Sequence, residues 1–247
     1  MTKRVISVFL CVLCVISSIS FIVSAKENKE YTSDNFLSVA DGIIAWKKAD
    51  NGSEPDGYLI NDKYLENAGT TPGDWYPIAL GRLGIQDNNE GYLAVIKDRV
   101  EERYRESGRL SAAKATEWHR IALAVLAMGG DPTNFGTDEN GAPINLIADG
   151  TYDRGKTTPL GRQGINGWIW GLITLDSMRY AVPDGAYNTR DDIIVEIISK
   201  QLSDGGFALS SDDADPDITA MAITALAPYY NSEKIYSYHR KALSADE

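Results

Sequence analysis

The chain has 247 residues, of which 43% are hydrophobic and 24% are charged, and its formal net charge is −11. This acidity argues against nucleic acid and anionic membrane surfaces as partners, because the phosphate contacts that dominate such binding need a basic face. The two cysteines, Cys11 and Cys14, both lie in an N-terminal targeting segment. The predicted mature chain therefore has no disulfide, no thiolate metal ligand and no cysteine nucleophile.

Residues 1–25 predict a signal peptide. Lys3 and Arg4 precede an uncharged apolar stretch, and the small residues Ser24 and Ala25 offer a cleavage site before a charged run. The apolar stretch is long enough to span a bilayer, so a retained N-terminal anchor is the alternative. Either outcome predicts a folded part that is extracellular or on the cell surface. Residues 26–34 predict a short disordered lead.

Residues 35–247 predict one all-α domain built from a repeat. Four segments share a register in which an acidic or amide residue is followed by a small residue five positions later and by leucine nine positions later. They start at Asp74, Glu117, Asn166 and Asp217. The starts are roughly 40 to 50 residues apart, which fits a repeat of two helices. No Pro-rich or Gly/Ser-rich linker divides the repeats.

Two kinds of helix alternate along this domain. The segment 216–227 is apolar on nearly every side, which predicts a helix that the fold covers all round. Segments 35–48, 90–107 and 191–201 instead show one apolar stripe each, and the stripe of 90–107 holds leucine, isoleucine, valine and tyrosine. Because inner helices need covering and outer helices meet water, this alternation predicts a double-layered helical ring without a sheet.

The C-terminal repeat resembles a known family. Residues 201–207 are similar to the Q-x3-G-x-W element of the squalene-cyclase and prenyltransferase repeat, with Phe207 in place of tryptophan, and residues 213–222 resemble its D-x-D-D-T-A motif. The nearest likeness is to repeat domains of secreted bacterial proteins, and a more distant one is to cobalamin carriers of the transcobalamin and intrinsic-factor type. The resemblance implies an α/α toroid of helical hairpins.

The pattern predicts an incomplete ring of about four to five hairpins, where the family usually has six. Its last element is an outer-helix pattern at residues 233–243. An unfinished ring exposes the apolar flanks of inner helices. The sequence therefore indicates either a truncated product or a ring that closes in another way.

The aspartates before the last inner helix have two interpretations. By the resemblance, Asp215 is the middle aspartate of the acid motif of terpene cyclases, with Asp213 and Asp217 beside it, and it would protonate an alkene. Pro216 interrupts that motif. The preferred interpretation is that Asp215 caps the helix, Pro216 is its first residue, and Asp217 interacts with the helix dipole. A calcium loop of the D-x-[DN]-x-[DN]-G type is absent.

A second set of carboxylates, Asp74, Glu117 and Asp217, occupies equivalent helix starts. Carboxylates gathered on one rim would suit glycoside hydrolysis or lyase chemistry, and helix capping is again the preferred interpretation.

Aromatic residues recur at the same positions. Their gathering inside a ring would suit an apolar, cationic or planar ligand, whereas core packing is the alternative for each single residue. The candidate ligand-binding residues are Trp75, Trp118, Trp168, Trp170 and Tyr230, with Tyr229 beside the last.

Metal and cofactor chemistry finds little support. His119 and His239 are the only histidines, and neither has a cysteine near it. The zinc site of protein prenyltransferases cannot be assembled from these residues, nor can an internal thioester, which needs cysteine. No metal and no cofactor is predicted.

These patterns predict a secreted or cell-surface module that binds a ligand without catalysis. The resemblance implies an apolar or corrinoid-type small molecule, or an isoprenoid. One alternative is a terpene cyclase or mutase with Asp215 as general acid. The others are a carbohydrate-active toroid and a structural repeat of a surface protein.

Overall fold

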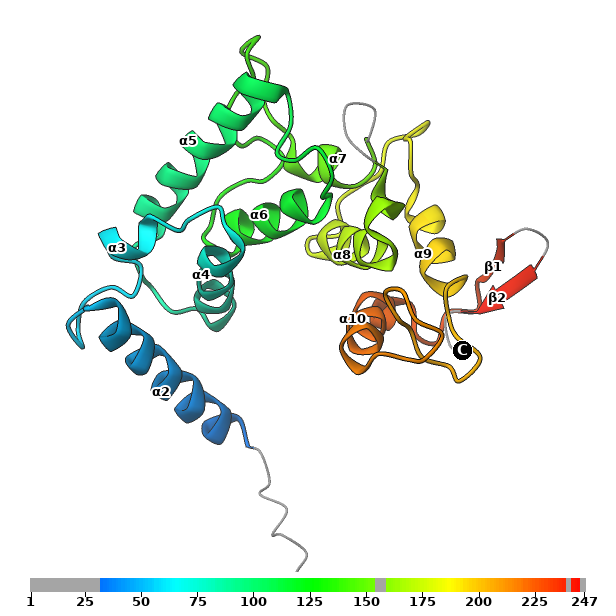
Figure 1. Ribbon diagram of the computed structural model, residues 1–247, viewed down its shortest axis with the longest axis horizontal. Coiled ribbons are helices and arrows are strands. Elements are labelled where there is room, and N and C mark those ends of the chain that lie inside the picture. The colour runs from blue at the N-terminus through cyan, green and yellow to red at the C-terminus, as the bar shows by residue number, and fades with distance from the viewer. Residues whose placement is uncertain (1–31, 154–158, 239–240, 245–247) are drawn as a thin grey trace, which may run out of the picture. The chain divides into compact units, whose positions relative to one another are not determined.

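The computed structural model describes residues 32–153, 159–238 and 241–244 (Figure 1). The described residues are mostly helical, as an all-α fold requires, and their strands form a single two-stranded hairpin. The chain divides into two compact units, residues 1–47 and residues 48–247. Helix α2 (Ser33–Asn51) begins in the first unit, and none of its residues is buried.

The second unit contains a helix at each of the four repeat positions. These are α4 (Thr71–Leu83), α6 (Thr116–Ala127), α8 (Ile165–Asp176) and α10 (Pro216–Leu226). Each packs against the next, α4 on α6, α6 on α8 and α8 on α10. The register found in the sequence therefore marks four successive helices that form one row in space (Figure 1).

Other elements connect and cover this row. They are α3 (Asp62–Leu65), α5 (Asn89–Ser107), α7 (Leu146–Gly150), the 3-10 turn η1 (Leu160–Gln163), α9 (Arg190–Ile198) and the 3-10 turn η2 (Ala227–Tyr229). Helix α5 buries Ile96, Val100 and Tyr104 of its predicted stripe, together with Tyr92. Helix α9 buries four isoleucines on one side and begins with a capping box between Thr189 and Asp192. The prediction of one-faced helices at these two places is confirmed.

Helix α6 is buried along most of its length, as α8 is. Seven of its twelve residues are buried, among them Trp118, His119 and Arg120. It has α4 on one side and α8 on the other, and α7 also packs on it. An apolar helix with neighbours on several sides loses its solvent face, so α6 forms part of the core.

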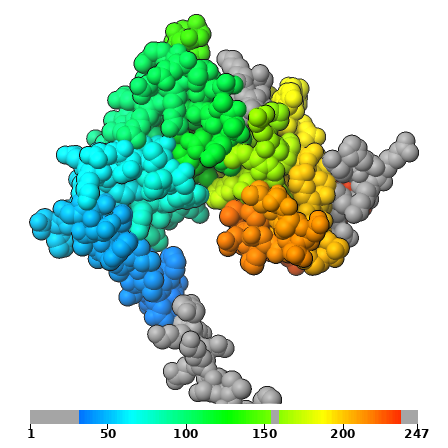
Figure 2. All heavy atoms as spheres, in the orientation of Figure 1, coloured from blue at the N-terminus to red at the C-terminus, as the bar shows by residue number. Residues whose placement is uncertain are grey.

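Helix α10 corrects an expectation. It buries only Ile218, Ala222 and Ala225, and the side chain of Ile223 is 61% exposed. Its main partner is α8, and the atoms of α10 form part of the surface in the space-filling view (Figure 2). The prediction that the fold covers this helix all round is wrong, because α10 has a neighbouring helix of the row on one side only.

The segment after η2 corrects a second expectation. Residues 233–243 were expected to form an outer helix, but they contain the antiparallel strands β1 (Ile235–Tyr238) and β2 (Lys241–Ser244). Tyr236 is buried while Ile235 is 69% exposed, which is the alternation of a strand. Aromatic and β-branched residues at consecutive positions favour this conformation over a helix.

The predicted signal peptide, residues 1–25, lies outside the described residues. Within the part of the chain that the structure describes, no helix combines the length and the apolar character needed to cross a membrane.

Candidate ligand-binding site

The N-terminal ends of α4, α6 and α8 surround a hollow of about 210 Å³. These are the ends at which the repeat register starts, so residues that the sequence makes equivalent meet in space. The hollow is lined by Thr71, Trp75, Lys114, Thr116, Glu117, Arg120, Gln163, Asn166 and Trp170. Its walls combine two indole rings with hydroxyl, amide and charged groups.

The two indole rings form the apolar part of the hollow. Trp75 and Trp170 have ring centroids 5.5 Å apart, and their planes are tilted by 57°. Trp75 is 42% exposed although it is a large apolar side chain. Because both rings line the hollow and Trp75 is exposed, they present aromatic surface to it. Both residues belong to the set of aromatics that the sequence predicts as ligand contacts.

The other predicted aromatics lie elsewhere. Trp118 is fully buried, and its Nε1 donates a hydrogen bond to the Tyr104 hydroxyl at 2.7 Å, so it belongs to the core. Trp168 covers Gly161, where an added Cβ would come within 2.9 Å of the indole Nε1. Tyr230 is 68% exposed. None of these three lines the hollow.

Asp74 lies behind the hollow and is fully buried. Its Oδ1 accepts hydrogen bonds from the Gly69 N–H and the Tyr92 hydroxyl, both at 2.7 Å, and its Oδ2 accepts one from Arg120 Nε at 2.8 Å. Burial raises the pKa of Asp74, and these three donors oppose the rise. Burial and the charge of Asp74 also raise the pKa of Tyr92, so its hydroxyl remains a donor.

Arg120 joins two of the three predicted rim carboxylates, Asp74 and Glu117. Its Nη1 and Nη2 donate to the two oxygens of Glu117 at 2.7 and 3.0 Å. The remaining donors reach the Thr71 hydroxyl and the Gly69 carbonyl, both at 3.2 Å. All five N–H groups of the guanidinium therefore have partners. Burial favours a higher pKa for Glu117, but its bonds to Arg120 and the charge of that residue outweigh burial and lower it.

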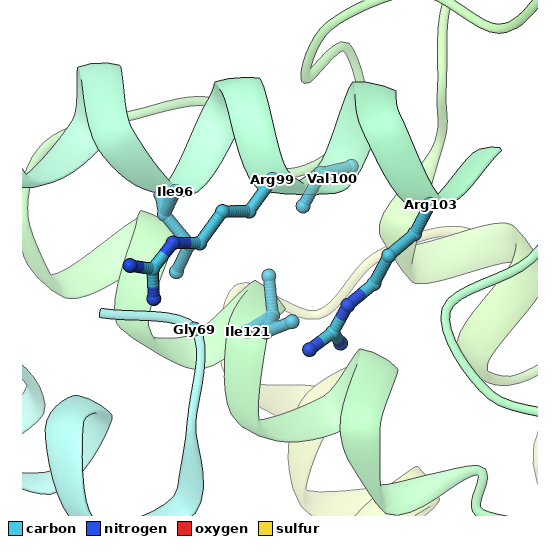
Figure 3. Close-up of a pocket in the computed structure, with 6 residues that line it drawn as sticks. All are labelled: Gly69, Ile96, Arg99, Val100, Arg103 and Ile121. Atoms are coloured by element: carbon cyan, nitrogen blue, oxygen red, sulfur yellow. The ribbon is translucent and has the colours of Figure 1, made fainter. Parts of the chain in front are cut away.

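Helix α5 carries Arg99 and Arg103, which extend from it toward Gly69 and Ile121 (Figure 3). Arg103 extends from α5 toward α6 and pairs with Glu117 at 3.4 Å. Arg99 reaches the loop of Gly69 and donates to the carbonyls of Ala68 and Glu66. The crevice between these arginines has no room for a water molecule, so it is a packed contact.

The polar edge of the hollow includes one acceptor without a partner. Gln163 Oε1 accepts from the backbone N–H and the hydroxyl of Thr116, at 3.2 and 3.3 Å, which satisfies the start of α6. Asn166 Oδ1 is buried and has no hydrogen-bond partner among the described residues. A buried acceptor of this kind requires a donor, from water or from a ligand.

Asp215 and its neighbours lie outside the hollow. Asp215 is exposed and caps α10, its carboxylate accepting from the N–H groups of Asp217 and Ile218 at 2.8 and 3.0 Å. Pro216 is the first residue of α10, and Asp213 and Asp217 are exposed. The capping interpretation is confirmed. Asp217 is consequently apart from Asp74 and Glu117, which share Arg120.

The histidines add no metal site. His119 is buried, and its Nε2 lies 2.7 Å from the Gly150 carbonyl oxygen, whereas His239 lies outside the described residues. No group of three or more His, Cys, Asp or Glu side chains arranged to hold a metal ion occurs in residues 32–153, 159–238 and 241–244.

Sequence reasoning missed Arg120, the residue that organises the site. One signal for it exists, because Arg120 is the single charged residue in the apolar run from Trp118 to Met128 and lies three positions after Glu117. A cation in such a run needs a buried partner. Gln163 and Lys114 gave no comparable signal.

Comparison with protein-family models, with curated proteins and with solved structures found no match to this chain.

Proposed function

We propose that this chain is a non-catalytic binding module and that the hollow between α4, α6 and α8 takes a saccharide ring. The observation that carries the proposal is the Trp75 and Trp170 pair, which forms an aromatic wall beside hydroxyl and amide groups. Concave sites of this composition bind small molecules with one apolar face and a polar edge.

A saccharide ring has this chemistry. Its C–H face packs on an indole ring, and its hydroxyl groups donate and accept hydrogen bonds around the edge. Asn166 Oδ1 supplies an acceptor in need of a donor, and Thr71, Thr116 and Lys114 add further polar groups to the lining of the hollow. The hollow, at about 210 Å³, suits a compact ring better than a corrinoid or a polyprenyl chain, the ligands that the family resemblance implies.

The carboxylates favour binding over catalysis. A general acid needs a proton to give, and a general base needs an available lone pair. Glu117 is held by Arg120 and Arg103, and Asp74 by three donors. Asp215, the acid of the alternative cyclase interpretation, is engaged with the start of α10. These roles argue that the rim carboxylates shape the hollow.

The row of helices supports the toroid interpretation of the fold. In this proposal α4, α6, α8 and α10 are inner helices, and α5 and α9 are outer helices. The ligand mouth then lies at the N-terminal ends of the inner helices. With the predicted signal peptide, the module would act outside the cell, on a soluble or surface saccharide.

Isothermal titration calorimetry of the purified protein tests the proposal. The titrants are neutral oligosaccharides of several linkages, cobalamin and a short polyprenyl alcohol, each at the same ionic strength. We expect saturable binding of at least one oligosaccharide and none of the other two. Binding of cobalamin or of the polyprenyl alcohol alone would contradict the saccharide assignment and support the ligand class that the resemblance implies.

A further inference from the structure

Three helices of the row end in the same way. A backbone N–H beyond each helix end bonds back to a carbonyl five residues earlier, at 3.0, 2.8 and 2.9 Å. The pairs are Ile85 to Leu80, Gly130 to Val125, and Tyr180 to Leu175. This bond belongs to the Schellman motif. In that motif the residue directly before the N–H donor needs a left-handed backbone.

The residue in that left-handed position differs in one helix. Gly84 closes α4 with φ of 70°, and Gly129 follows α6 with φ of 90°. After α8 the position belongs to Arg179, with φ of 52°. Glycine adopts this conformation freely, but an arginine is strained in it because of its Cβ. An arginine in a turn that the repeat twice builds with glycine indicates a use for its side chain.

The side chain of Arg179 lines a second hollow, separate from the tryptophan site and about 510 Å³ in volume. Its other lining residues are Asp176, Arg190, Pro228 and Tyr229. These come from the C-terminal end of α8, the first position of α9 and the turn η2.

The one carboxylate of this hollow is already engaged. Asp176 accepts hydrogen bonds from Arg190 Nε at 2.8 Å and from the Tyr229 hydroxyl at 2.7 Å. Arg190 Nη2 also donates to the Tyr180 carbonyl at 2.8 Å. The backbone N–H of Arg179 donates to the Asp176 carbonyl at 3.1 Å, whereas its guanidinium has no hydrogen bond and no ion pair with any residue that the structure describes. The lining thus carries two cations and one anion.

We propose that this second hollow is an oxyanion site, in which Arg179 binds a carboxylate or phosphate group of a ligand. Its planar fork of N–H donors matches both groups. Arg190, fixed by Asp176 and by the Tyr180 carbonyl, places a second positive charge beside the first. An exposed cation without a partner is notable in a chain whose formal net charge is −11.

Calorimetric titration with inorganic phosphate and with acetate, at constant ionic strength in chloride, tests this site and separates the two ligand groups. We expect the native protein to bind at least one of the two anions. Arg179→Gly should weaken that binding at least tenfold while the melting temperature stays equal or rises, because glycine relieves the left-handed backbone. Arg105→Ala, which removes an exposed arginine from α5, should leave binding unchanged.

Two results would overturn the proposal. One is equal affinity of the native and Arg179→Gly proteins for the anions, and the other is a native protein that binds neither anion. Arg179→Asn serves as a second variant, since asparagine also tolerates a left-handed backbone. It should lose binding as Arg179→Gly does.

Discussion

Helices α6 and α10 occupy equivalent positions in the repeat, and α10 has fewer charged residues, yet α10 is the less buried of the two. α6 packs between α4 and α8, while α10 has α8 as its neighbour in the row. Seven of the twelve residues of α6 are buried, whereas only three of the eleven residues of α10 are. Burial in this fold therefore depends on the number of neighbouring helices, and the apolar composition of a helix does not determine it.

The same two helices also differ in the surroundings of their first acidic residue, although these two residues occupy the same position in the repeat. Glu117 at the start of α6 is held by a buried arginine, while Asp217 at the start of α10 is exposed and meets the helix dipole. A carboxylate between two helices becomes part of a charge cluster, and one at an open end contributes to its own helix. The hollow of the proposed binding site is lined by the first of these two carboxylates, Glu117.

The largest expected effect comes from removing the cation of the cluster. Arg120→Ala leaves Asp74 buried without its counter-charge, and we expect the free energy of unfolding to fall by about 3–5 kcal/mol. Asp217→Ala, the matched change on α10, removes only a dipole interaction and should cost about 0.3–1 kcal/mol. Urea denaturation measures both values. Equal losses in the two variants would contradict the contrast between α6 and α10.

The sequence predicts part of this contrast and misses the rest. Apolar periodicity reveals α4, α6, α8 and α10, because each helix has its own local pattern. Hydrophobic periodicity contains no information on how many helices pack around a given helix. It therefore predicts, wrongly, that α10 is covered all round. It also placed Asp74 and Glu117 at equivalent helix starts, but which donors they meet depends on loop geometry around Gly69. The contact between Trp75 and Trp170 is likewise tertiary, since they belong to different repeats.

A smaller effect is expected at the cap of α10. Asp215→Ala removes the acceptor for two backbone N–H groups and should cost about 1 kcal/mol, whereas Asp215→Asn keeps a good capping residue and should cost less. Thermal unfolding followed by far-UV circular dichroism measures this difference. A loss in the asparagine variant as large as in the alanine variant would contradict a capping role.

The smallest effect concerns pH. Folding lowers the pKa of Glu117, so its carboxylate stabilises the fold at pH values above the pKa that Glu117 has in the unfolded chain. This stabilisation is lost as the pH falls through the pKa that Glu117 has in the folded protein. Glu117→Gln should therefore reduce the free energy of unfolding at pH 7 and reduce it by less at pH 3. Urea titrations at the two pH values give the comparison. A cost that is the same at both would exclude a titrating role for Glu117.

The most direct test of the binding site compares two tryptophans. Trp75 lines the hollow, and Trp46, which is 62% exposed on α2, does not. For the oligosaccharide that the native protein binds, we predict that Trp75→Ala raises the dissociation constant at least tenfold, as expected for a central aromatic contact. We predict no change for Trp46→Ala. Unchanged affinity in Trp75→Ala, with the protein still folded, would contradict the assignment of the hollow as the site.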